Sequence, residues 1–161
     1  MQKITTFLMF NDQADAAVNL YTSVFKNSKI VSMHRAGPSP TDAVMSATFQ
    51  LEVQQFMAFN GGPRFKFTWA ISMFVTCKDQ KEVDRVWKKL VAGGKSLQCG
   101  WLEDRYGLAW QIIPSGMLDM IGHRDRVKAG RAVQAMLRMV KIDIGQIRRA
   151  FAGKQALGRV G

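Results

Sequence analysis

Hydrophobic and polar positions along the chain predict one order of elements, which then occurs a second time. Residues 4–10 are apolar and prone to form a strand. Residues 14–25 carry apolar side chains at the spacing of one helix face, with Asp12 as the predicted N-cap. Further strands are predicted at 29–35, 44–51 and 56–60. The first part of the chain is therefore expected to form a strand, a helix and three more strands.

The same order returns after a glycine- and proline-containing turn. A strand is predicted at 70–77, and Asp79 with Glu82 has the spacing of a capping box at the start of a helix. The expected buried stripe of this helix is Val83, Val86, Trp87 and Leu90. A short strand at 95–99 and a hairpin at 101–113 complete the second unit.

Two such units predict an α+β fold, because each curved sheet can cover the open face of the other. An offset of 66 residues aligns Thr6 with Ser72, and an offset of 67 aligns 12–13 with 79–80. We expect a single domain of 1–161, divided into a first module of about 3–62, a second of about 69–114, a helical extension of 115–152 and a tail of 153–161. Asp143 is the predicted cap of the last helix in the extension.

Composition narrows the classes of function. The chain has 47% hydrophobic residues, enough for a packed core, and no apolar run long enough for a membrane span. Cys77 and Cys99 follow no zinc or disulfide spacing, so we expect a cytoplasmic protein with no membrane partner. Residues 124–161 carry ten basic and two acidic side chains. We interpret this excess as a solvated helix face and do not expect nucleic acid, because exposed aromatic residues are not interleaved with the charges.

Several segments together resemble one known family. They are 56–63 (FMAFNGGP), 70–72 (AIS), 99–101 (CGW) and 104–114 (DRYGLAWQIIP), and the later helices also fit at 134–137 (QAML) and 141–144 (KIDI). The chain resembles, over about residues 3–152, the PhnB-like group of the glyoxalase/bleomycin resistance/dioxygenase (vicinal oxygen chelate) superfamily. Members of this group often carry the label 3-demethylubiquinone-9 3-methyltransferase. The resemblance implies paired βαβββ modules that form a cupped mixed sheet around a pocket, usually in a homodimer.

The resemblance also indicates where a metal would bind. Carried over by position, the ligand sites of metal-dependent members fall on Thr6, Ala58, Ser72 and Gln111. Ala58 has no donor atom, and neutral hydroxyls are poor ligands for divalent transition metals. We therefore expect no metal and no cofactor. The chain also departs from the group at Arg64, where members often carry His, and at Trp69, where they often carry Glu.

The predicted function is binding of a small organic molecule in a metal-free pocket. The candidate pocket residues are Thr6, Ser72, Gln111, Asn60, Cys99, Trp101 and Trp69. Ordinary core packing is the competing interpretation for the aromatic residues and for Cys99, and a plain turn is the competing interpretation for Asn60. An enzyme of the superfamily, with ligands supplied across a dimer, remains the alternative. The residues leave open whether any reaction is catalysed, and no catalytic residue is assigned.

Overall fold

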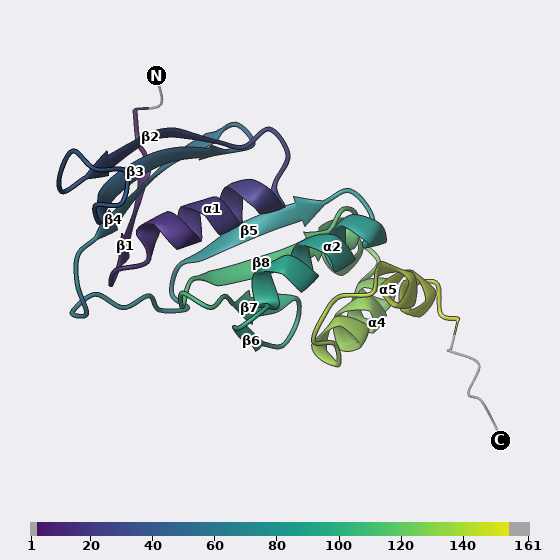
Figure 1. Ribbon diagram of the computed structural model, residues 1–161. Coiled ribbons are helices and arrows are strands. Elements are labelled where there is room, and N and C mark those ends of the chain that lie inside the picture. The colour runs from purple at the N-terminus through teal and green to yellow at the C-terminus, as the bar shows by residue number, and fades with distance from the viewer. Residues whose placement is uncertain (1–2, 155–161) are drawn as a thin grey trace. The chain divides into compact units, whose positions relative to one another are not determined.

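The computed structural model describes residues 3–154 and contains two four-stranded sheets, each with its own helix (Figure 1). The chain divides into two compact units. The first comprises the residues up to Trp69 together with Tyr106–Leu108, and the second comprises Ala70–Arg105 and the residues from Ala109 onward. Because each unit has its own sheet and core, each is described separately.

The first unit follows the predicted order. Its elements are β1 (Thr6–Phe10), α1 (Ala14–Val24), β2 (Lys29–Arg35), β3 (Val44–Leu51) and β4 (Gln54–Asn60). The strands lie in the order β1-β4-β3-β2, with β1 parallel to β4 and the other neighbours antiparallel. The first and last strands of the module are thus hydrogen-bonded neighbours.

The second unit repeats this topology. Its elements are β5 (Ser72–Cys77), α2 (Gln80–Val91), β6 (Lys95–Ser96), β7 (Trp101–Glu103) and β8 (Ala109–Pro114), and the strand order is β5-β8-β7-β6. Here β5 is parallel to β8, and the remaining pairs are antiparallel. The predicted α+β class with two βαβββ modules is confirmed.

Helix α1 covers one face of the first sheet. The ring centroid of Tyr21 lies 6.3 Å from that of Phe49 in β3, and Phe49 stacks on Phe56 in β4 at 5.3 Å. All three side chains are buried. Since side chains alternate between the faces of a strand, one set lies under α1 and the alternate set lies on the opposite face.

The start of α1 differs from the prediction. The N-cap is Gln13 rather than Asp12, and no local side chain caps the helix. Instead, Oδ1 of Asn60, at the end of β4, accepts a hydrogen bond of 2.8 Å from the backbone N–H of Ala14. Nδ2 of Asn60 donates to the Val44 carbonyl oxygen at 2.8 Å. The prediction of Asp12 as the cap is therefore wrong, because a residue distant in sequence satisfies the helix end.

Helix α2 begins as its sequence predicts. The Asp79 carboxylate accepts from the Glu82 backbone N–H at 2.9 Å, and the Glu82 carboxylate accepts from the Lys78 backbone N–H at 2.8 Å. The predicted stripe is buried: Val83, Val86, Trp87 and Leu90. This stripe packs on the face of the second sheet that carries Trp110 and Ile112, both of which are buried.

Three helices follow the second sheet, namely α3 (Met117–Ile121), α4 (Arg126–Leu137) and α5 (Ile144–Phe151). Asp143 caps α5 as predicted, because its carboxylate accepts from the Gln146 N–H at 2.9 Å. A buried cluster joins these helices to the end of β8: Ile113, Met117, Ala132, Ile142, Ile144 and Ile147. Within residues 3–154, no helix has the length and apolar character needed to cross a membrane. Most of the predicted tail, from residue 155 on, lies outside the described residues.

A glycine allows the loop before α5 to lie close to the second sheet. Gly100 has φ of 82°, and its N–H donates to the Val140 carbonyl oxygen at 2.7 Å. A Cβ added at this position would lie 2.9 Å from Ile142 and 3.1 Å from the Ile112 carbonyl oxygen. Both the positive φ and the close approach therefore require glycine here.

Candidate functional site

The face of the second sheet opposite α2 brings together three of the predicted pocket residues. In the strand register, Gln111 of β8 pairs with Trp101 of β7 on one side and with Phe74 of β5 on the other. Paired residues project from the same face of a sheet. Ser72, two residues before Phe74 in β5, shares that face. None of these four side chains is buried, and Phe74 is 47% exposed.

A direct hydrogen bond links two of these residues. Nε2 of Gln111 donates to Oγ of Ser72 at 2.8 Å. Because a side-chain amide can also accept through its oxygen, Oε1 of Gln111 remains an acceptor, and the Ser72 hydroxyl proton remains a donor. Neither group bonds to another residue within the described part of the chain. The pair therefore presents one acceptor and one donor between the exposed ring of Phe74 and the partly exposed ring of Trp101.

A carboxylate and an amine lie at the β6 edge of the same face. Glu103 follows Trp101 by two residues in β7, and its Oε1 lies 3.1 Å from Nζ of Lys95. The Lys95 side chain is largely exposed, so this ion pair contributes little to stability. In the strand register Glu103 pairs with Ala109, which pairs with Ser72 on its other side, so the ion pair lies on the β6 side of the row that contains Ser72.

The two cysteines have different surroundings. Cys99 is half-buried in the turn before β7 with φ of 60°, and its N–H donates to the Met139 carbonyl oxygen at 2.8 Å. Cys77 is buried at the end of β5, and burial, with a smaller effect of the Glu82 carboxylate, raises the pKa of its thiol to about 12. Cys77 is thus protonated at neutral pH and serves as a core residue.

Three predicted pocket residues belong to the first unit. Asn60 uses both polar atoms of its side chain to join α1 and β3, as described above. Trp69 is 55% exposed in the segment between β4 and β5. Thr6 pairs with Phe56, which stacks on Phe49 under α1. Thr6 therefore projects from the helix-covered face of its sheet, as does the buried Ala58 two residues along β4 from Phe56.

Thr6 and Ser72 are consequently not equivalent in the two modules. Ser72 projects from the face opposite its helix, whereas Thr6 projects from the face that its helix covers. An offset of 67 residues, which aligns Phe10 with Cys77 before each helix, places Thr5 opposite Ser72 instead. A shift of one residue along a strand reverses the face on which a side chain lies.

The sequence interpretation missed the residues on the open face of the first sheet. Phe7 and Met57 pair across β1 and β4, and Thr48 of β3 pairs with Met57 on its other side. The rings of Phe7 and Phe59 lie 6.2 Å apart. Phe7 is 49% exposed. The offset of 67 residues, already present in the aligned pairs 12–13 and 79–80, was the signal that would have identified this face.

The residues at the metal positions of the superfamily do not fit a divalent transition metal. Within residues 3–154, no three His, Cys, Asp or Glu side chains gather where they could hold an ion. Ser72 and Gln111 offer one hydroxyl and one amide, and these two groups are bonded to each other. Thr6 and Ala58 project from the face under α1. Imidazole, thiolate and carboxylate, which such metals prefer, are missing from this set.

Comparison with known proteins identifies the family. The family described as 3-demethylubiquinone-9 3-methyltransferase matches residues 2–113, which is more than half of the chain. The chain belongs to this family. The PhnB protein from Bacillus cereus is 42% identical, and the match covers 71% of this chain and all of that protein, with a TM-score of 0.65. No curated protein matches.

Solved structures with lower identity share the fold of this PhnB-like protein. Protein PA1353 from Pseudomonas aeruginosa is 21% identical, with a TM-score of 0.60 and coverage of 71% of this chain and 98% of that one. The fosfomycin resistance protein FosX from Listeria monocytogenes is 12% identical, with a TM-score of 0.50 and coverage of 71% and 93%. The family match ends at residue 113, so helices α3 to α5 lie beyond it.

Proposed function

We propose that this PhnB-like protein binds a small organic molecule on the open face of its second sheet, without a metal ion. The observation that carries the proposal is the Gln111–Ser72 hydrogen bond beside the exposed ring of Phe74 and the partly exposed ring of Trp101. Small-molecule sites are mostly apolar, with a few well-placed polar groups that fix the orientation of the ligand. This face has that composition.

The geometry favours a flat ligand with at least one polar group. Gln111 lies between Trp101 and Phe74 in the strand register, so the hydrogen-bonding groups are flanked by aromatic surface on both sides. A planar ring would contact the aromatic side chains, and its carbonyl or hydroxyl group would bond to the Ser72 hydroxyl or to Oε1 of Gln111. The family's description refers to a demethylated ubiquinone, which is a flat ring with groups of this kind.

The open face of the first sheet supports a ligand of the same character. Phe7, Met57 and Phe59 form apolar surface on the side of β1 and β4 away from α1. We infer that each open face can bind such a ligand by itself, and that residues 1–161 form a single domain. A homodimer and a cytoplasmic location accompany this proposal, because the family resemblance implies the first and the reduced cysteines favour the second.

The proposal is tested with a neutral fluorescent probe, the naphthyl ketone Prodan, because a neutral ring with one acceptor oxygen avoids attraction to the positive charge of the chain. Probe emission rises on transfer to an apolar site, so titration yields a dissociation constant. We expect Gln111→Ala to weaken binding about fivefold, or about 1 kcal/mol, because the Ser72 hydroxyl that donates to the ketone oxygen loses the amide bond that orients it. Trp101→Ala should weaken binding further because it removes ring contact.

The matched control is Gln98→Ala, which makes the same change at an exposed position in the turn before β7. Its dissociation constant should equal that of the unaltered protein. Urea unfolding of each variant separates binding from stability. Equal affinity in Gln111→Ala and Gln98→Ala, or a loss of affinity that follows a loss of folded protein, would disprove the proposed site.

A further inference from the structure

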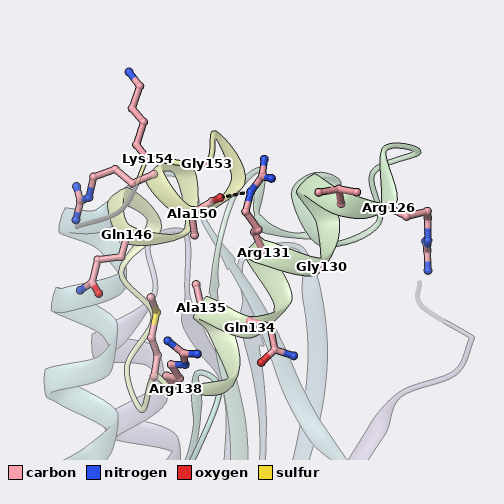
Figure 2. Close-up of a pocket in the computed structure, with 13 residues that line it drawn as sticks. Arg126, Gly130, Arg131, Gln134, Ala135, Arg138, Gln146, Ala150, Gly153 and Lys154 are labelled. Carbon is pink, nitrogen blue, oxygen red and sulfur yellow. Dashed lines mark hydrogen bonds between the residues drawn. The ribbon is translucent and has the colours of Figure 1, made fainter. Parts of the chain in front are cut away.

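A concave groove of about 930 Å³ is lined by α4, α5 and the residues that follow each helix (Figure 2). The two helices are joined by Arg131 of α4, whose Nε donates to the Ala150 carbonyl oxygen at 2.9 Å and whose Nη2 donates to that of Phe151 at 2.8 Å. The volume of the groove falls within the range of small-molecule sites. The match to the family model ends at residue 113, before the helices that line this groove.

The charge of the groove has one sign. Residues 124–154 contain nine basic and two acidic side chains. Among the described residues that line the groove, no side chain is acidic and none is aromatic. The cationic lining residues are Arg126, Arg131, Arg138, Arg149 and Lys154. Four of these five are arginines, whose planar fork matches the geometry of phosphate oxygens.

Small residues in the lining leave room for a ligand close to the helix backbones. The lining includes Gly130 and Ala135 of α4, Ala150 of α5, and Gly153 just after it. A Cβ added at Gly130 would meet no atom within 4 Å, so the space beside this helix position is open. The groove is therefore open beside this part of α4.

One of the cations is held in place before any ligand arrives. Two of the five N–H groups of Arg131 bond to the last carbonyls of α5, and the other three bond to no described residue. Gly153 has φ of 76°, and a Cβ at this position would lie 3.4 Å from the Arg131 guanidinium. The guanidinium is thus fixed in position, which lowers the entropic cost of binding an anion.

The remaining cations are spread along the groove. Arg126 begins α4 and Arg138 is its C-cap, and this separation of twelve residues corresponds to about 18 Å along a helix. In Figure 2 the side chains of Arg126 and Lys154 point outward, and Arg131 points toward Ala150. Asp143, the N-cap of α5, lies close enough to Arg149 to offset part of its charge. Charges spaced in this way suit several anionic groups better than a single one.

The geometry points to a binding site for a small ligand that carries two or more phosphate groups. Arginine forks favour phosphate, and the volume is that of a small-molecule site. Single-stranded nucleic acid is disfavoured, because its binding sites combine positive charge with aromatic side chains on which bases stack, and the described lining has none. This inference concerns a different surface from the open sheet face and does not depend on the proposed function.

The test is calorimetric titration of the full chain with inorganic tripolyphosphate and, separately, with inorganic phosphate. We expect tripolyphosphate to bind the more tightly. Arg138→Gln and Arg149→Gln should each weaken its binding about tenfold, because each removes a charge-assisted hydrogen bond. The matched control is Arg148→Gln, on the same helix and adjacent to Arg149, which is exposed but does not line the groove. This variant should change affinity less than twofold.

A second variant blocks the space without changing the charge. Gly130→Leu places a side chain in the open space beside α4 and should weaken tripolyphosphate binding about tenfold, while Gly130→Ala keeps most of the space. Circular dichroism confirms folding, which is expected because glycine is unfavourable within a helix. Equal losses in Arg148→Gln and Arg149→Gln would overturn the inference, as would affinity for tripolyphosphate no greater than for phosphate. A short DNA duplex that outcompetes tripolyphosphate and still binds Gly130→Leu would overturn it too.

Discussion

Asn60 accepts a hydrogen bond of 2.8 Å through Oδ1 from the backbone N–H of Ala14, so the last residue of β4 caps the helix that follows β1. Nδ2 of the same side chain donates to Val44 at the start of β3. Three elements of the first unit therefore meet at one amide. Because neither Asp12 nor Gln13 caps α1, the helix start depends on the completed sheet.

Replacing Asn60 with alanine should lower the free energy of unfolding by about 2 kcal/mol, because both the helix cap and the bond to Val44 are lost. Urea unfolding followed by circular dichroism measures the change. Asn60→Asp keeps the acceptor for Ala14 and should cost less than Asn60→Ala. Asn11→Ala, an exposed control of the same chemistry, should change stability by less than about 0.5 kcal/mol. Equal stability of Asn60→Ala and Asn11→Ala would contradict the assigned role.

A second prediction concerns the buried Asp104, which is 2% exposed. Its Oδ2 accepts a hydrogen bond of 2.8 Å from Nε1 of Trp110, which is also buried. Asp104→Ala leaves this indole N–H without its acceptor and should destabilise the protein by about 2–3 kcal/mol. Asp104→Asn retains an oxygen and should cost less. The urea midpoints of the two variants are compared with that of the unaltered protein. A similar loss of stability in both variants would show that the bond to Trp110 is unimportant.

The raised pKa of the Cys77 thiol leads to a prediction of how the stability of the protein changes at alkaline pH. Its pKa is raised from 9.0 to about 12 in the folded protein, chiefly by burial. Above pH 9 the unfolded chain releases this proton while the folded chain keeps it, so ionisation favours unfolding. The stability that the protonated Cys77 thiol gives the folded protein is fully present below pH 9, and it is lost as pH rises toward 12.

Cys77→Ala removes this titration. The variant should be less stable at neutral pH, because a buried sulfur is lost, but its stability should decline less steeply above pH 9 than that of the unaltered protein. Urea midpoints across this pH range give both slopes. Parallel slopes would show that the thiol does not ionise on unfolding. Alkylation with iodoacetamide under native conditions should also reach Cys99 before Cys77.

The Asp143 carboxyl should make stability fall at acid pH, whereas the Cys77 thiol makes it fall at alkaline pH. Hydrogen bonds from the side chain and backbone of Gln146 hold the pKa of its carboxyl below 3.8. The stabilisation is therefore present above pH 3.8 and is lost as pH falls through the lower value of the folded protein. Asp143→Ala should cost about 1 kcal/mol at neutral pH. The difference from the unaltered protein should shrink at acid pH, and a constant difference would contradict this account.

The order of the elements could be predicted from the sequence, because strands and helices in this chain have distinct periodicities. Strands β2 and β3 begin and end at the predicted residues, and the buried stripe of α2 is the one expected. The strand predicted at 95–99 is shorter, because Cys99 and Gly100 both have positive φ and bond to residues 139–140. That contact joins segments far apart in sequence, so no local pattern could reveal it.

The sequence could predict candidate residues on the second sheet, but not those on the first sheet or in the groove. Trp101, Ser72 and Gln111 share one face, because side chains alternate along β5, β7 and β8 and these strands pair in the register observed. The first strand carries apolar residues on both faces, so its pattern could not show which face Thr6 occupies. The role of Asn60 depends on strand pairing, and the groove beside Arg131 depends on how two helices pack. Neither feature has a signature in local sequence.

The parallel pairing of β1 with β4 sets the order in which the protein can acquire structure during translation. In its sheet β1 pairs with β4 and not with β2, so during synthesis β1 has no partner in this sheet until residue 60 has emerged. The first unit also includes Tyr106–Leu108, and the Tyr106 ring contacts Phe10 and Tyr21 edge-on. Its core is therefore completed only after most of the second sheet has been synthesised. A nascent chain of this length exposes β1 as an unpaired edge, which is the stage at which protection from aggregation would matter most.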